Sequence, residues 1–141
     1  MLAAALMLTN LEHVGVAVQN LDAATSLYTV LLGEAPYKRE HVASEAVDTV
    51  FFRVGNSKVE LLAGTSPDSA ISKYLSKKPE GIHHLAFEVT DIRAEMARLR
   101  AAGFVLLNEE PKLGADNKLV CFVHPKSANG VLVELCQSIG E

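Results

Sequence analysis

Apolar and polar positions alternate at the start of the chain in the way that a β-strand requires. Within Leu11–Val18, Val14 and Val16 fall on one side, whereas His13 and Gly15 fall on the other. The pattern that follows predicts a helix that begins at Asn20 and ends at Gly33, and its apolar face consists of Leu21, Ala24, Leu27, Tyr28, Leu31 and Leu32. Strands are then expected at Tyr37–Val42, Val47–Val54 and Lys58–Leu62. A short helix at Ala70–Lys77 follows, capped by Asp68 or Ser69.

The same order of elements then starts again. A strand is expected at Ile82–Val89, followed by Asp91 as a helix cap. The remaining elements are a helix with Ile92, Met96 and Leu99 inward and Gly103 at its end, strands at Phe104–Leu107, Leu119–Val123 and Val131–Cys136, and a loop at Glu109–Asp116.

The second half is a copy of the first at an offset of 71 residues. Moving LEHVGVAV by that offset lays His13 on His84 and an apolar residue on an apolar residue at every second position. After a turn that is three residues longer, Glu60 falls on Glu134 within identical VEL triplets. Each half therefore reads β-α-β-β-β and carries one His and one Glu at corresponding places.

Two such copies predict an α+β fold. Placed side by side, they form one curved eight-stranded mixed sheet with helices outside and a concave face inside. We expect a single domain over residues 9–137, with a first module at about 11–64, a linker helix at about 69–79 and a second module at about 81–137.

Composition narrows the possible partners. The chain has 141 residues and a net charge of −4, which disfavours nucleic acid as a partner. Its first eight residues, MLAAALML, are too few to span a bilayer and lack a basic start, so we expect an extension or added strand rather than a signal. Cys121 and Cys136 lie in apolar runs and are expected to be buried, reduced thiols, as in a reducing compartment.

Strand alternation also predicts a metal site. It turns His13, Glu60, His84 and Glu134 away from the helix side, onto the concave face. Two imidazoles and two carboxylates suit Zn²⁺, Co²⁺, Mn²⁺, Ni²⁺ or Fe²⁺. A lone strand His or Glu is more often a solvated surface residue, and only the symmetric repetition favours ligands. Small neighbours leave room for something other than protein, and His83 is expected to point the opposite way.

Several long strings carry a resemblance to a known family. They are TSPDSAISKYL (65–75), GIHHLAFEVTDI (81–92) and HPKSANGVLVELCQ (124–137). The chain resembles the vicinal-oxygen-chelate (glyoxalase-like) superfamily and, within it, the methylmalonyl-CoA epimerase family. The resemblance implies a divalent-metal enzyme of propionyl-CoA metabolism that interconverts the R and S forms of methylmalonyl-CoA, with Co²⁺ as the ion expected in vitro. It further implies a homodimer. The reduced cysteines indicate the cytoplasm, or the mitochondrial matrix of a eukaryote, and neither a membrane nor nucleic acid is expected as a partner.

The resemblance also implies roles for individual residues. His13, His84 and Glu134 match the family's metal ligands, and Glu60 matches its fourth position, where some relatives carry Gln. Inversion at C2 requires a proton to leave one face and return to the other, so two acid/base groups are needed. Glu134 is one candidate. The other is either Asp48, which lies near the position of a proposed glutamate base in one family member, or Glu45 in the preceding turn. The lysines available for CoA phosphates are Lys73, Lys77, Lys78, Lys112, Lys118 and Lys126.

Other functions would use the same fold. A glyoxalase-type isomerase or an extradiol-type dioxygenase would keep the metal, and a small-molecule-binding protein would need no catalysis. The dioxygenase site requires Fe²⁺ held by two His and one carboxylate, so a fourth ligand at Glu60 disfavours it. Binding proteins of the superfamily generally lack the metal ligands that this chain carries.

Overall fold

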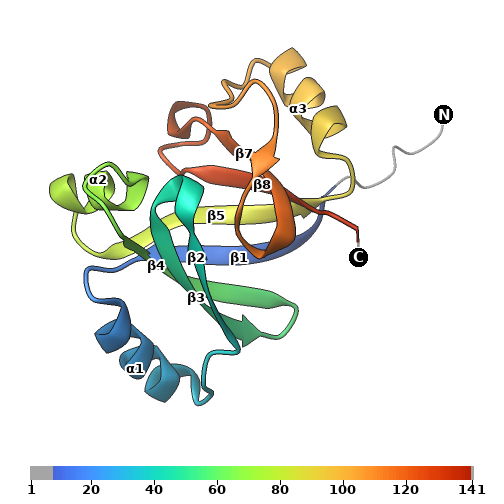
Figure 1. The fold of residues 1–141 in the computed structure, drawn as a ribbon. Coiled ribbons are helices and arrows are strands. Elements are labelled where there is room, and N and C mark those ends of the chain that lie inside the picture. Colours follow the sequence, from blue (N-terminus) through green and yellow to red (C-terminus); the bar gives the residue numbers. More distant parts are fainter. Residues whose placement is uncertain (1–7, 141) are drawn as a thin grey trace. The chain divides into compact units, whose positions relative to one another are not determined.

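The computed structural model describes residues 8–140 (Figure 1), so most of the segment MLAAALML lies outside the described part. The helices are α1 (Leu21–Leu32), α2 (Ala70–Lys77) and α3 (Ile92–Ala101). The strands are β1 (Leu8–Ala17), β2 (Lys38–Val42), β3 (Val47–Val54), β4 (Ser57–Gly64), β5 (Gly81–Val89), β6 (Lys112–Leu113), β7 (Lys118–Val123) and β8 (Val133–Ser138). Short 3₁₀ helices lie at η1 (Ala43–Glu45), η2 (Ala115–Asn117) and η3 (Pro125–Ser127).

The strands form a mixed sheet in the order β2-β3-β4-β1-β5-β8-β7-β6. Parallel pairing joins β1 to β4 and β5 to β8, whereas the outer pairs of each module are antiparallel. The predicted α+β fold with eight strands is confirmed. The described part of the chain divides into two compact units, His13–His84 and residues 8–12 with 85–140. The expectation of a single domain stays a prediction.

Within the unit His13–His84, the first module of the repeat forms as the sequence predicts. Asn20 Oδ1 accepts a hydrogen bond from the Ala23 N–H at 3.0 Å and begins α1, which ends at the left-handed Gly33. Gly55 also has positive φ, at 58°, as the two-residue hairpin between β3 and β4 requires. The helix side of this sheet segment buries an apolar cluster of Val16, Val18, Leu21, Val50, Phe52, Leu61 and Ala63.

The apolar face of α1 is narrower than the sequence suggests. Ala24, Tyr28 and Leu32 pack on the cluster, as expected. Leu27 and Leu31, which were expected on the same face, are 64% and 67% exposed. One helical stripe about 100° wide is sufficient to cover the sheet at this point, and these two leucines lie beyond it.

Helix α2 has no counterpart in the other module, and it covers the sheet face opposite α1. Ser69, one of the two candidates, is its cap, because its Oγ accepts from the Ile71 N–H at 3.1 Å. Ile71 is buried against Ala17 and Leu62, which are paired across β1 and β4. Ala17 is on the same side of β1 as His13, so α2 seals one end of the face that carries the predicted ligand.

The unit with residues 85–140 repeats this arrangement. Asp91, at the position that the repeat lays on Asn20, accepts from the Ala94 N–H at 3.1 Å and begins α3. Gln137 Oε1 on β8 accepts from the Ile92 N–H at 2.7 Å and fixes the start of that helix on the sheet. The core of this unit consists of Val89, Ile92, Met96, Leu99, Cys121, Val123 and Leu135.

The expected strand at Phe104–Leu107 is wrong. This segment makes one isolated bridge, Leu106 to Val123, and the edge strand β6 lies instead within the expected loop. The side chain of Asn108 accepts from the Phe122 N–H at 2.9 Å, and this donor is then not available to extend the ladder along the segment. Phe104 and Leu106 nevertheless pack on the core, which explains their apolar character.

Candidate metal site

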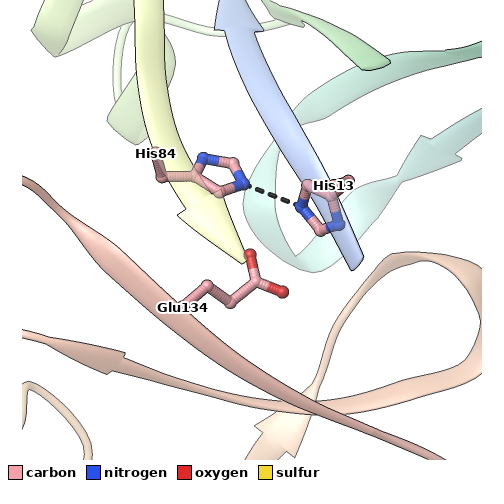
Figure 2. Close-up of side chains that lie close together, drawn as sticks. All are labelled: His13, His84 and Glu134. Carbon is pink, nitrogen blue, oxygen red and sulfur yellow. Dashed lines mark hydrogen bonds between the residues drawn. The ribbon is translucent and has the colours of Figure 1, made fainter. Parts of the chain in front are cut away.

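Two buried imidazoles face each other where β1 and β5 are neighbours. The Nε2 atoms of His13 and His84 are 2.9 Å apart, and the rings meet edge to face with centroids 5.0 Å apart. Both residues are only 5% exposed. Figure 2 shows this contact as a dashed line between the two rings, and it also draws the Glu134 side chain on β8.

The spacing of the two nitrogens fits a shared ion. Two nitrogens each about 2.05 Å from one ion are about 2.9 Å apart at a right angle, and about 3.3 Å apart at a tetrahedral angle. Imidazole nitrogen suits Zn, Co, Ni and Fe ions. The donor set of this pair therefore fits a divalent transition metal.

Glu60 contacts the other side of the His13 ring. Its Oε2 is 3.1 Å from His13 Nδ1, and its side chain is buried. A carboxylate on the outer nitrogen of a metal-binding histidine fixes the orientation and tautomer of the ring. This contact can hold the His13 ring in place, and the role of Glu60 as a fourth ligand stays a prediction.

The strand register is the same in both copies of the repeat. Glu60 pairs with Gly15 across β1 and β4, and Glu134 pairs with Ala86 across β5 and β8. In each copy the partner lies two residues after the histidine, and residues two apart on a strand share a face. Each module therefore directs its histidine and its glutamate to the same side of its own strand pair.

Gly15 is the close neighbour that makes room for His84. A Cβ at Gly15 would lie 2.3 Å from His84 Cε1 and 2.6 Å from its Nδ1, far inside van der Waals contact. The sequence suggested that small residues here leave space for a non-protein group. In the structure, the space above Gly15 is filled by the His84 ring.

Strand parity suggested that His83 points away from this cluster, but its ring contacts the cluster. Its Nδ1 lies 2.9 Å from Nδ1 of His84. On its other side, the Tyr74 ring of α2 meets it edge to face at 4.9 Å. The expected orientation of His83 is wrong, because regular alternation does not hold for the rings of this histidine pair at the start of β5.

The structure separates the two candidate bases on the first module. Asp48 contacts His41 at 2.7 Å and Arg39 at 3.6 Å, and it pairs in register with Ala63 of the helix-side cluster. Glu60 lies on the other face of β4, so the register argues against Asp48 as a base beside the histidines. Glu45 ends η1, is half-buried, and precedes Ala46, which has a positive φ of 53°.

A buried carboxylate beside His13 was not predicted from the sequence. Glu12 is 6% exposed, and its Oε2 lies 3.7 Å from Lys118 Nζ, which also donates to Ser138 Oγ at 2.9 Å. Lys118 was a candidate for CoA phosphates, but its ammonium group lies among protein groups here. The only signal for Glu12 was its position beside His13.

The two cysteines are free and buried, as expected. Burial, and then the neighbouring Glu134 carboxylate, raise the pKa of the Cys136 thiol well above its ordinary value. Cys136 therefore stays protonated and is an unsuitable metal ligand or nucleophile. Burial also raises the pKa of Cys121.

Comparison with known proteins defines the class to which this fold and histidine pair belong. Residues 12–122 match the model of the Glyoxalase/Bleomycin resistance protein/Dioxygenase superfamily, and the chain belongs to this superfamily. Within it, the similar proteins include the ethylmalonyl-CoA/methylmalonyl-CoA epimerase of Cereibacter sphaeroides, which is 43% identical over 93% of this chain and 99% of its own.

Solved structures give the same result. The methylmalonyl-CoA epimerase of Mycobacterium tuberculosis superposes with a TM-score of 0.90 at 36% identity, over 99% of this chain and 94% of its own. A variant of the Streptomyces coelicolor methylmalonyl-CoA epimerase, in complex with 2-nitronate-propionyl-CoA, has the same TM-score of 0.90 at 34% identity, over 94% and 96% of the two chains. The resemblance found in the sequence is confirmed.

A membrane-spanning helix was not expected from the sequence. Within residues 8–140, none of the helices combines the length and the apolar character needed to cross a bilayer.

Proposed function

We propose that this protein is a divalent-metal-dependent epimerase that interconverts (2R)- and (2S)-methylmalonyl-CoA. The observation that carries the proposal is the buried pair of His13 and His84, whose Nε2 atoms are 2.9 Å apart in a chain of this family. The relatives named as epimerases support the substrate. That the chain forms a homodimer stays a prediction.

In this proposal His13, His84 and Glu134 hold the ion. The histidines offer their Nε2 atoms, and Glu134 occupies in the second module the register position that Glu60 occupies in the first. Glu60 keeps the His13 ring in place by contacting Nδ1 of His13. A bound ion would stabilise the negative charge that develops on the substrate oxygens when the C2 proton leaves.

The protein's own carboxylates move the proton. Removal from one face and return to the other needs two groups, and we assign these roles to Glu45 and Glu134. Asp48 is left out because it pairs with His41 and Arg39 on the helix side of β3. Glu45 is half-buried on η1, in the connection that leads into β3, and is the remaining carboxylate among the candidates.

Deuterium exchange at C2 of methylmalonyl-CoA in D₂O tests the function. Metal-stripped protein should exchange slowly, and protein reloaded with Co²⁺ should exchange and invert the substrate. Folded, metal-loaded protein that catalyses no exchange would show the proposal to be wrong. Glutathione adducts and catechols would then be the next substrates.

The assignment of the two bases has its own test. We expect Glu45→Gln to lower epimerisation by about 10²- to 10⁴-fold. Because one base remains, this variant should still exchange the C2 proton of one enantiomer without inverting it. Asp48→Asn is the matched control and should retain near wild-type rates of both processes. Equal loss of exchange from both enantiomers in Glu45→Gln would contradict a two-base assignment.

A further inference from the structure

His84 is held from both sides, and its second contact is with a residue of no assigned role. Its Nε2 faces His13, and its Nδ1 lies 2.9 Å from Nδ1 of His83. We propose that His83 is a positioning residue for the metal site, which accepts a hydrogen bond from His84 Nδ1–H. The inference rests on the proposed function, since it concerns the same site.

The protons on the two rings can be placed by counting. A neutral imidazole has one N–H and one lone pair, so a histidine that binds metal through Nε2 carries its proton on Nδ1. Two Nδ1 atoms at 2.9 Å form a hydrogen bond only if one donates and the other accepts. When His84 binds metal through Nε2, the acceptor is therefore Nδ1 of His83, whose own proton lies on Nε2.

The two histidines of the pair thus have different supports. His13 Nδ1 contacts a buried carboxylate, Oε2 of Glu60, at 3.1 Å, whereas His84 Nδ1 contacts an imidazole. A carboxylate makes the attached histidine a more basic ligand than a neutral acceptor does. The two halves of the repeat are similar in their ligands and differ in the groups behind them.

Helix α2 supplies the outer support for His83. The Tyr74 ring packs edge to face on His83 with centroids 4.9 Å apart, and its hydroxyl donates to the Ile82 carbonyl at 3.2 Å. The helix itself is anchored by the Ser69 cap and by the buried Ile71. Helix α2, the linker between the modules, has no copy in the repeat. It therefore helps to position the His83 ring beside the proposed metal site.

A pair of isosteric substitutions tests the hydrogen bond. Asn places its side-chain oxygen near the position of His Nδ1 and can accept the same bond, whereas Leu has similar volume and cannot. We expect His83→Leu to weaken Co²⁺ binding about 10- to 100-fold, and His83→Asn to stay within about threefold of wild type. His41→Leu is the control, because His41 is an exposed histidine on the helix side of the sheet. This variant should not change the affinity for Co²⁺.

Affinity is measured by competition with a chromophoric chelator, and the visible spectrum of bound Co²⁺ reports whether the ligand geometry has changed. Unchanged affinity and spectrum in His83→Leu would overturn this inference but not the proposed function. Equal weakening of Co²⁺ binding by both variants would also overturn it, because it would indicate a packing role for His83. Wild-type protein that binds no Co²⁺ would overturn both the inference and the proposed metal dependence, and this is seen before any variant is compared.

Discussion

Thr49 on β3 has an unusual environment for a polar residue. Its side chain is 1% exposed, and its Oγ1 is the single buried side-chain polar atom without a hydrogen-bond partner in the described part of the chain. Thr49 pairs with Leu62 on β4, on the same face as Glu60. A buried hydroxyl without a partner loses its hydration and gains nothing in exchange.

We therefore expect Thr49→Val to stabilise the fold. The substitution exchanges the hydroxyl for a methyl group of similar size and should raise the free energy of unfolding by about 1 kcal/mol. Urea unfolding of metal-free protein measures this change. Thr25→Val is the matched control, because Thr25 Oγ1 donates to the Leu21 carbonyl at 2.7 Å, and it should be destabilising. A loss of stability in Thr49→Val would mean that the hydroxyl has a partner such as an ordered water.

Single residues could be placed from the sequence only where the strand has one apolar and one polar face. Alternation is clear around His13, and its face was predicted correctly relative to Val14 and Val16. In β3, by contrast, Val50, Phe51 and Phe52 are all buried, so the sequence does not show which face Asp48 takes. His83 was misplaced because side-chain torsions, which parity does not describe, bring its ring to His84.

Strands β1 and β5 depend on each other at Gly15. The His84 ring occupies the volume that any side chain at this position would need, with a Cβ only 2.3 Å from Cε1. An alanine would have to displace the ring or push the strands apart. The absence of a side chain at Gly15 therefore leaves the room that the His84 ring occupies.

Gly15→Ala should disturb both the histidine pair and the fold. We expect Co²⁺ affinity to fall at least about 10-fold and the free energy of unfolding to fall by about 1–3 kcal/mol. Gly114→Ala is a control for crowding alone, because its Cβ would meet a Val120 methyl at 2.9 Å and no histidine. That control can lose stability but should bind Co²⁺ normally. Normal binding by Gly15→Ala would show that His84 can move without loss of the site.

Whole elements were easier to predict than their neighbours in space. Helix starts at Asn20, Ser69 and Asp91 depend on local capping, which the sequence contains. The edge strand β6 was missed because two residues carry too little pattern, and the expected strand at Phe104–Leu107 had apolar residues that pack on the core without forming a ladder. Local patterns do not determine which segment takes the sheet edge.

At the scale of the whole molecule, the repeat was the strongest information in the sequence. An offset of 71 residues predicted that both modules would have the same register, and Glu60–Gly15 and Glu134–Ala86 agree with it. The repeat could not predict helix α2, which lies between the two modules, nor the contacts of Glu60 with His13 and of His83 with His84.

Metal binding at the proposed site should be visible in the thermal stability of the protein. An ion that binds the folded state alone stabilises it by about 2.7 kcal/mol at 100 times its dissociation constant. For a chain of this length, we expect the midpoint of thermal unfolding to rise by roughly 10 °C on addition of Co²⁺. Chelation should reverse the shift, which differential scanning calorimetry measures.

Variants show whether the shift comes from the histidine pair. His13→Ala combined with His84→Ala should unfold at the same temperature with and without Co²⁺, because no imidazole pair remains to bind the ion. His41→Ala keeps the pair and should retain the full shift, which excludes binding at an exposed histidine as the cause. If the double variant kept the shift, the stabilising ion would be bound elsewhere. If wild type had no shift but remained active, the proton transfer would not depend on a tightly bound metal, and Glu45 and Glu134 would have to act without it.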